Sequence, residues 1–271
     1  MDRRLTPANG RVADIALQGQ VTAQRFTAGD PARILRPVED LRPAPGAMRD
    51  RQLLWGEGVT VYEHHDGWAF VRAARDGYVG YVESAALGGP DPATHRVAVP
   101  ATIMFEGENL KSRDIAHLSF GARITVLNEC RHFWETAQGF IPKKHLRPLD
   151  RPLNDPVTVA QLFFGAPYLW GGNSIIGIDC SGLVQAAHLA CDIACPGDSD
   201  LQEAALGRET YAPPRRGDIW FWKGHVGLVV DEDTLIHASG HHMAVVYEPL
   251  QSAELRIKGL GGGEVTARKR L

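Results

Sequence analysis

Asp179-Cys180-Ser181-Gly182 is the stretch of sequence that decides the fold of the C-terminal half of this chain. Apolar residues follow it at the spacing of one helix face: Leu183, Val184, Ala187 and Ala190. We therefore predict an α-helix with Asp179 as its N-cap and Cys180 in its first turn. The positive end of the helix dipole favours a thiolate there, and Gly182 lets another element approach closely. A cysteine taken alone is more often a small buried apolar residue, so its neighbours decide between the two roles.

Two histidines downstream are candidates for the base that a nucleophilic cysteine needs. Residues 218–222, 225–230, 235–238 and 244–247 read as strands, and the acidic turn at 231–233 predicts a hairpin. His225 and His237 are 12 residues apart, so both point to one face of this hairpin, with β-carbons roughly 5 to 8 Å apart. One histidine could take the proton of the cysteine, while the other holds the imidazole of the first in the required tautomer. Separately, each histidine is better explained as a turn or core residue; together with Cys180 they indicate a cysteine-based active site.

The order of elements in this half is that of an α+β domain, which we place at residues 151–271. Asp155-Pro156 has the form of an N-cap followed by proline at the first helical position, and we expect this helix to run through Phe164. Helices thus come first and antiparallel strands follow. Glycines and basic residues after Gly259 predict a solvated, mobile end.

The N-terminal half is predicted to hold two small β-barrels behind an extended lead-in. Residues 1–45 form the lead-in, where four prolines exclude a long helix: Pro31, Pro37, Pro43 and Pro45. Residues 46–92 and 93–150 then share a rhythm of short alternating strands, with a central tryptophan at Trp68 in the first and Trp134 in the second. The alternative is one larger β-domain whose halves are similar by coincidence.

Composition restricts the classes of function. The chain has 271 residues, with 29 Lys and Arg against 32 Asp and Glu, so its net charge is −3. It therefore has no excess of positive charge with which to bind the phosphates of a nucleic acid. No apolar run approaches the ~18 residues of a membrane-spanning helix, and the N-terminus has no apolar stretch of secretory length. We therefore expect a cytoplasmic protein that binds neither nucleic acid nor membrane.

The 4 cysteines are too few and too unevenly placed for a disulfide framework, so we expect reduced thiols. A zinc site built from Cys191, Cys195, His241 and His242 is an alternative. Adjacent histidines on a strand point to opposite faces and no CxxC pair occurs, so the sequence disfavours this site.

The motifs together resemble the NlpC-type cell-wall peptidases, a papain-like cysteine peptidase family. The resemblance covers about residues 152–250 and rests on four motifs in family order: Asp179-Cys180-Ser181-Gly182, Gly217-Asp218, Gly224-His225-Val226-Gly227 and Ile236-His237-Ala238. Members of this family cleave the γ-D-glutamyl bond to the diamino acid of peptidoglycan stem peptides. The resemblance implies Cys180 as the nucleophile, His225 as the base and His237 as the orienting residue, with no metal or other cofactor.

The N-terminal half resembles bacterial SH3-like domains, through Gly67-Trp68 and Asp76-Gly-Tyr78-Val-Gly80. SH3-like modules ahead of an NlpC-type domain are typical of γ-D-glutamyl-L-diamino-acid endopeptidases of the dipeptidyl-peptidase VI type. In those enzymes an SH3-like domain forms one wall of the site and admits only peptides with a free N-terminal L-Ala. The matched substrate-contacting positions are Tyr78, Asp179, Ser181, Asp198 and Ser199, and Asp50 is the candidate for binding the substrate amine.

This resemblance implies a murein tripeptide or tetrapeptide as substrate, release of L-Ala-γ-D-Glu, and a role in recycling wall peptides. Three alternatives remain: a secreted hydrolase acting on intact peptidoglycan, a non-catalytic wall-peptide binder, and an acyltransferase or amidase with the same three residues. Retention of Cys180, His225 and His237 argues against the non-catalytic binder. The preferred diamino acid and the oligomeric state are left open.

Overall fold

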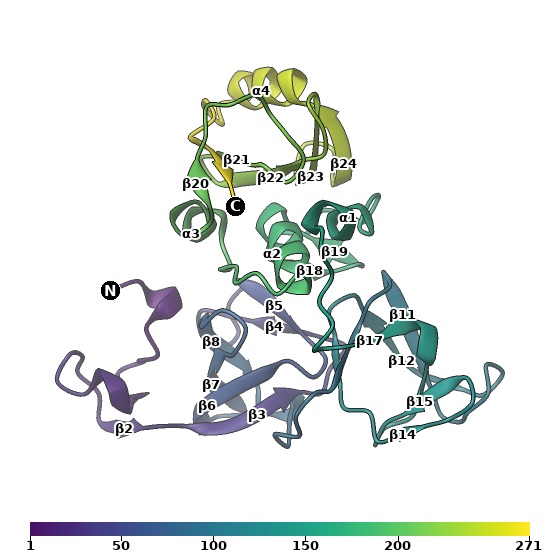
Figure 1. Ribbon diagram of the computed structural model, residues 1–271. Coiled ribbons are helices and arrows are strands. Elements are labelled where there is room, and N and C mark those ends of the chain that lie inside the picture. The colour runs from purple at the N-terminus through teal and green to yellow at the C-terminus, as the bar shows by residue number, and fades with distance from the viewer. The chain divides into compact units, whose positions relative to one another are not determined.

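A computed structural model describes residues 1–271 and divides into two compact units, Met1–Leu149 and Asp150–Leu271. Strands make up most of the N-terminal unit, whereas the C-terminal unit combines helices with one large sheet (Figure 1). None of the helices has the length and apolar character needed to cross a membrane.

The first part of the N-terminal unit is a five-stranded sheet with an accompanying two-stranded hairpin. The sheet has the order β8-β7-β6-β3-β9, with β3 (Asp30–Ile34), β6 (Gly58–His65), β7 (Trp68–Ala73), β8 (Val79–Glu83) and β9 (Leu87–Gly88). The hairpin pairs β4 (Val38–Leu41) with β5 (Arg51–Leu54). Its core includes Ile34, Leu41, Leu53, Val71 and Val82, all fully buried.

The expected lead-in at residues 1–45 is wrong in its second half. β3 pairs with β6 and β9, and β4 pairs with β5, so the first barrel-like sheet begins near Asp30 rather than at residue 46. Prolines exclude a helix here but permit this strand: β9 pairs only with Arg33 and Ile34, so Pro31 has no second neighbouring strand. Ahead of it, β1 (Val12–Asp14) pairs in parallel with β2 (Arg25–Thr27).

The second part of the N-terminal unit has its own two sheets. One is β13-β10-β17, with β10 (His95–Val97), β13 (Arg123–Ile124) and β17 (Leu146–Pro148). The other is β12-β11-β16-β15-β14, with β11 (Ala101–Phe105), β12 (Asp114–Ser119), β14 (Asn128–Glu129), β15 (Phe133–Glu135) and β16 (Phe140–Pro142). A separate core forms here around Val97, Met104, Leu118, Ile124 and Ile141.

The two parts repeat one local plan. β7, β8, a 3-10 helix at Ser84–Ala86 and β9 follow one another in the first, and β15, β16, a 3-10 helix at Lys143–His145 and β17 follow in the second. Two further 3-10 helices lie at Arg3–Leu5 and Ile15–Leu17. Leu54 of β5 packs in the core of the second part, so the two parts share a boundary. Their description as two separate SH3-like barrels stays a prediction.

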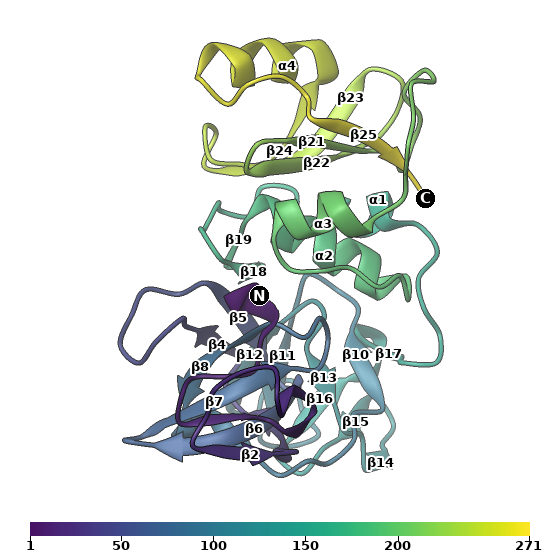
Figure 2. The ribbon, with the colours of Figure 1, turned by 90° about the vertical axis from the view of Figure 1, so that its left-hand side faces the viewer.

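The C-terminal unit is a six-stranded antiparallel sheet with helices on both faces. Its order is β20-β25-β21-β22-β23-β24, with β20 (Arg208–Glu209), β21 (Ile219–Trp222), β22 (His225–Val229), β23 (Thr234–Ser239), β24 (Ala244–Pro249) and β25 (Ala267–Arg270). One face is covered by α1 (Pro156–Gln161), α2 (Cys180–Ala190) and α3 (Ser199–Ala205), and the other by α4 (Leu250–Gly259) (Figure 2). A short hairpin, β18 (Asn173–Ser174) and β19 (Gly177–Ile178), precedes α2.

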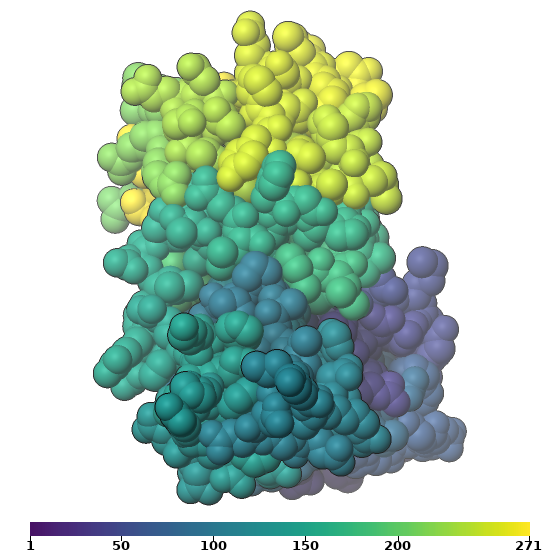
Figure 3. Space-filling view, turned by 90° about the vertical axis from the view of Figure 1, so that its right-hand side faces the viewer, coloured from purple at the N-terminus to yellow at the C-terminus, as the bar shows by residue number.

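Apolar side chains between the sheet and α4 form the core of this unit on the α4 side. They are Trp220, Trp222, Val229, Leu235, Leu250, Ala253 and Ile257. In the space-filling view the helical layer, teal to green, lies directly against the layer of the sheet and α4, coloured toward yellow (Figure 3). The predicted order of helices first and antiparallel strands after is therefore observed, although α1 ends at Gln161 rather than Phe164.

The prediction of a mobile end after Gly259 is wrong. β25 lies between β20 and β21 as an integral strand. Arg270 donates to Oδ1 and Oδ2 of Asp218, each at 2.7 Å, and the Asp218 side chain is only 2% exposed. The stretch Ala267-Arg-Lys-Arg270 has no apolar alternation, so its sequence carried no strand signal.

Candidate functional site

Cys180 is the first residue of α2, as predicted. The Asp179 side chain caps this helix: Oδ1 accepts from the Gly182 amide at 2.6 Å, and Oδ2 accepts from the Gly171 amide at 2.9 Å. Gly182 is required here because a β-carbon at this position would lie 2.4 Å from the carbonyl oxygen of Gly172. The capping carboxylate and the glycine together fix the start of α2 and therefore the position of the thiol.

The expectation that the helix start alone favours a thiolate does not hold in this structure. Cys180 is buried, and this burial, with the negative charge of Asp179, raises the pKa of its thiol to about 12. Backbone amides at Val226, Ser181 and Cys180 act in the opposite direction without outweighing burial. The resting group is therefore a thiol, and a base must remove its proton before it can act as a nucleophile.

His225 and His237 meet as the hairpin register predicts. Nε2 of His225 lies 2.8 Å from Nδ1 of His237. β22 and β23 pair only at Leu228–Ile236 and Val229–Leu235, so the two histidines lie beyond the paired segment and approach diagonally. Near Val226, β22 is not paired with β23, and the Val226 amide contacts the Cys180 sulfur instead. This contact places β22 against the first turn of α2.

Both histidines are neutral near physiological pH. Burial, reinforced by His237, lowers the pKa of His225 to about 3, and burial also lowers the pKa of His237. Only neutral imidazole has a lone pair with which to accept a proton. His225 is therefore in the protonation state that a general base requires.

Sequence reasoning missed the groups behind His237. Its Nε2 lies 3.1 Å from Oε2 of Glu248 on β24, close in distance although not in ideal hydrogen-bond alignment. Arg256 of α4 donates to both oxygens of Glu248, from Nε at 2.9 Å and from Nη2 at 2.7 Å. A glutamate on a strand is ordinarily solvated, so nothing in the local sequence distinguished Glu248 from a surface residue.

The predicted substrate-contacting residues of the C-terminal unit lie at two helix starts. Ser181 donates to Oδ1 of Asp179 at 3.0 Å. Asp198 is the N-cap residue of α3 and Ser199 its first residue. Gln202 ties the two helix starts together because its side-chain amide donates to the Ser181 carbonyl at 2.9 Å and to the carbonyl of Gly197 at 3.1 Å.

Tyr78 and Asp50 belong to the N-terminal unit. Tyr78 is buried in the core of the first sheet, with the Arg51 guanidinium 5.8 Å from its ring centre. Asp50 accepts from Nη2 of Arg3 at 2.8 Å. Their roles in substrate binding stay predictions.

Tyr168 is a further polar group beside the nucleophile. Burial raises the pKa of its hydroxyl well above the usual range, and the charge that Cys180 carries when it is ionised and the charge of Asp179 act in the same direction. The hydroxyl therefore stays protonated and can donate. Trp170, two residues on, is 70% exposed. Tyr168 is therefore the better candidate of the two for a contact at the reacting centre.

Side chains that could hold a metal ion gather at His237, His242 and Glu248, whose ligand atoms lie within 4.8 Å of one another. The Glu248 oxygens accept from Arg256, and Nδ1 of His237 faces His225, so the observed contacts are those of a hydrogen-bonded chain. This group of possible ligands differs from the alternative zinc site considered above, which consisted of Cys191, Cys195, His241 and His242.

The free energy of unfolding of the C-terminal unit is expected to fall on acidification. Burial lowers the pKa of His188, His225 and His237 from the ordinary 6.5, so below that pH the unfolded chain binds protons that the folded chain does not. Stability is therefore complete above pH 6.5 and declines below it by up to about 1.4 kcal/mol per pH unit and per histidine.

Urea unfolding between pH 7.5 and 5, followed by tryptophan fluorescence, measures this slope. His188→Leu removes one fully buried imidazole and should flatten the slope, whereas His241→Gln alters an exposed one and should not. An equal slope in the wild type and His188→Leu would contradict the assignment.

Comparison with known proteins gives two family matches. Residues 165–257 match the NlpC/P60 family model, and residues 41–87 match the model of the bacterial dipeptidyl-peptidase SH3 domain. The second span begins inside the expected lead-in, which agrees with the observed position of β4.

Relatives and solved structures extend these matches. The chain is 25% identical over 240 residues to a gamma-D-glutamyl-L-lysine dipeptidyl-peptidase of Bacillus cereus, covering 75% of this chain and 71% of the relative. It is 37% identical over 84 residues to dipeptidyl-peptidase 6 of Lysinibacillus sphaericus, covering 31% of each. An NlpC/P60 family protein of Bacillus cereus of known structure superposes with a TM-score of 0.76 at 19% identity, over 89% of this chain and 99% of that one, so the fold is shared.

Proposed function

We propose that this chain, a cysteine peptidase of the NlpC/P60 family with an SH3 domain of the bacterial dipeptidyl-peptidase type, cleaves the bond between γ-D-glutamate and the diamino acid of wall-derived peptides. The observation that carries the proposal is the start of α2, where the Cys180 sulfur contacts the backbone amide of Val226 on β22. The residue before Val226 is His225, which is hydrogen-bonded to His237. Hydrolysis of wall peptides by this family agrees with the names of the relatives.

The geometry suggests which atoms carry the proton. Nε2 of His225 faces His237, so Nδ1 is left to take the proton from the Cys180 sulfur. The thiolate then attacks the γ-carbonyl carbon, and the amides of Cys180 and Ser181 at the helix start stabilise the oxyanion. His225 passes its proton to the amine of the leaving diamino acid, and a thioester forms on Cys180.

Water completes the cycle. His225 is neutral again and takes a proton from a water molecule, while the oxygen of this water attacks the thioester carbon. The carbon–sulfur bond breaks, the sulfur regains a proton from His225, and the product leaves with a free γ-carboxylate. In a tripeptide substrate this product is L-Ala-γ-D-Glu.

We further infer that a carboxylate recognises the free amine of the N-terminal L-Ala. A buried ammonium needs an opposite charge because an unpaired buried ion is costly. Asp50, Asp179 and Asp198 are the candidates, with Asp50 the one that the family resemblance favours. Asp50 now pairs with the half-exposed Arg3, a contact that an incoming ammonium could replace.

Support for this specificity comes from the SH3 match at residues 41–87 and from relatives named gamma-D-glutamyl-L-lysine dipeptidyl-peptidase. The recurring strand plan of residues 93–148 supports a second SH3-like module. We also propose that the enzyme acts in the recycling of wall peptides in the cytoplasm.

The free-amine requirement is tested with matched peptides. L-Ala-γ-D-Glu-L-Lys, the analogue with meso-diaminopimelate, and the N-acetylated form of each are incubated with the enzyme, and products are followed by mass spectrometry. We expect L-Ala-γ-D-Glu from the free peptides, and a kcat/KM at least ~30-fold lower for the acetylated ones, because acetylation removes the charge that pairs with the carboxylate.

The comparison of the two free peptides gives the preferred diamino acid. Equal cleavage of free and acetylated peptides would retain the peptidase and overturn the amine site, which favours a hydrolase of intact wall. Cleavage of none of the four would overturn the proposed substrate.

A further inference from the structure

We infer that Glu248, held by Arg256, is a positioning residue that fixes the tautomer of His237 and thereby leaves Nδ1 of His225 free to act as the base. This inference rests on the proposed function, in which His225 is the base. It concerns two residues, on β24 and α4, that lie outside the four motifs described above.

The contacts form one chain from Arg256 of α4 to His225, the residue before Val226, whose backbone amide contacts the Cys180 sulfur. Arg256 donates two hydrogen bonds to Glu248, Glu248 lies 3.1 Å from Nε2 of His237, and Nδ1 of His237 lies 2.8 Å from Nε2 of His225. The register of the sheet sets this order: Leu235 pairs with Glu248, so Glu248 is diagonal to His237 on the same face.

Hydrogen-bond polarity then determines where each proton resides. Glu248 is a carboxylate and can only accept, so His237 must carry its proton on Nε2. Nδ1 of His237 is then an acceptor, which requires that His225 carry its proton on Nε2 and donate it to His237. The remaining nitrogen of His225, Nδ1, has a free lone pair.

Arg256 keeps Glu248 ionised and immobile. Burial by itself raises the pKa of Glu248. Hydrogen bonds from Arg256 and His237 outweigh burial and hold this pKa well below its usual range. The two parallel bonds from one planar guanidinium fix the carboxylate in orientation as well as in charge. A protonated Glu248 could donate to Nε2 of His237 and reverse every hydrogen bond of the chain, and a rotated carboxylate would leave Nε2 without its acceptor.

Several charged and titratable groups face the histidine pair from the surrounding elements. They are Glu248 on β24, Arg256 on α4, His242 in the turn before β24, and Lys223 and His241, which line a cavity of about 270 Å³ with His225 and Arg256. Cys180, with Asp179 beside it, approaches from α2 through its contact with the Val226 amide. Among them Glu248 is the anion that contacts an imidazole, and it stabilises the imidazolium that forms when Cys180 loses its proton.

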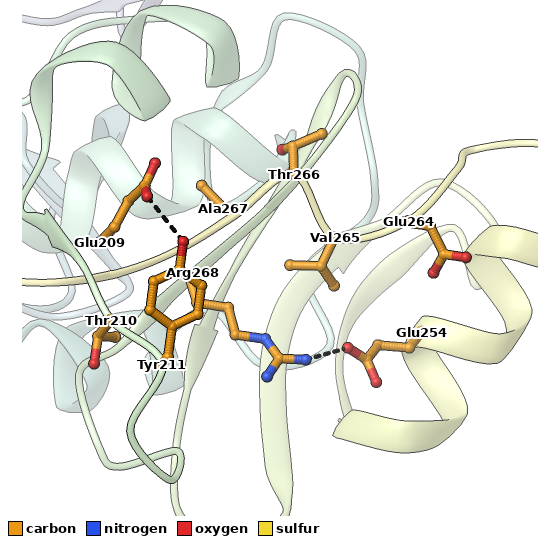
Figure 4. A pocket seen from close by; sticks show the side chains of 9 residues that line it. All are labelled: Glu209, Thr210, Tyr211, Glu254, Glu264, Val265, Thr266, Ala267 and Arg268. Atoms are coloured by element: carbon orange, nitrogen blue, oxygen red, sulfur yellow. Dashed lines mark hydrogen bonds and ion pairs between the residues drawn. The ribbon is translucent and has the colours of Figure 1, made fainter.

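A matched control pair exists in the same unit. Arg268 donates to Glu254 at 2.8 Å, and Figure 4 shows this ion pair at the wall of a separate pocket, away from any histidine. Glu254 also belongs to α4 and also binds an arginine. Glu254→Gln therefore reproduces the loss of a glutamate–arginine pair without altering an imidazole.

The experiment compares the full-length wild type with Glu248→Gln, Glu248→Ala, Glu254→Gln and His225→Gln. The first readout is the rate at which iodoacetamide alkylates Cys180 as a function of pH, quantified on the tryptic peptide by mass spectrometry. The second is ¹⁵N NMR of the imidazoles, which reports the tautomers of His225 and His237. The third is kcat and KM on the tripeptide.

We expect Glu248→Gln to keep the tautomers, because the amide oxygen still accepts from Nε2 of His237, but to move the alkylation midpoint to higher pH, because the imidazolium loses its counter-charge. Glu248→Ala should move the midpoint and also lose the fixed tautomers. Loss of a residue that orients a functional side chain typically lowers activity by 10- to 100-fold. We therefore expect kcat to fall by about 100-fold in Glu248→Ala and by less in Glu248→Gln, with KM little changed.

The readouts separate the inference from the substrate proposal. Altered alkylation and tautomers without hydrolysis of any peptide, even by the wild type, would support the inference and reject the substrate. Glu248 variants that match Glu254→Gln in midpoint and tautomer, whatever their thermal stability, would show a merely structural ion pair and overturn the inference. If His225→Gln has the same alkylation midpoint as the wild type, then His225 is not the base, and the role of Glu248 as its positioning residue is overturned as well.

Discussion

Cys180→Ala is expected to lower kcat/KM on the tripeptide by at least about 10⁴-fold, the order of loss seen when a catalytic nucleophile is removed. The variant removes the only atom that forms the thioester, while the amides at the start of α2 and the His225–His237 pair remain in place. Because the side chain is buried and small, the cost in free energy of unfolding should stay near 1 kcal/mol.

Release of L-Ala-γ-D-Glu, followed by mass spectrometry, measures this loss. Cys195→Ala is the matched control, since Cys195 is also a buried cysteine of the C-terminal unit that forms no disulfide, and the variant should retain wild-type kcat and KM. Residual turnover by Cys180→Ala within 10-fold of the wild type would assign the nucleophile to another group.

His237→Ala is expected to lower kcat by about 10³- to 10⁴-fold, comparable to the loss of the group that fixes a catalytic histidine in other triads. His225 would lose the acceptor for its Nε2 proton and be free to rotate or to change tautomer. Glu248 would also be left buried without its imidazole partner, which costs stability as well.

His237→Asn separates these effects. An asparagine can accept from His225 through its carbonyl oxygen and donate to Glu248 through its amide, so it should recover much of the activity that alanine loses. His188→Leu, at another fully buried histidine of the same unit, should change stability but not kcat. Equal activity of the alanine and asparagine variants would contradict an orienting role for His237.

Local rules predicted much of the C-terminal unit. The N-cap at Asp179, the start of α2 at Cys180 and the four strands of residues 219–249 follow from capping and periodicity, which act within a few residues. The same rules failed at β25 and β3. One is a basic stretch without alternation and the other contains a proline, and both are strands because neighbours distant in sequence supply their hydrogen bonds.

The candidate site divides in the same way. Strand alternation by itself determined that His225 and His237 share a face, and helix capping determined that Cys180 opens a helix, because both depend only on residues close in the chain. Only the tertiary structure decided that the thiol rests protonated and that Glu248 and Arg256 continue the chain behind His237. Desolvation of the thiol and the meeting of β24 with α4 arise from packing between separate elements, which no local pattern of residues encodes.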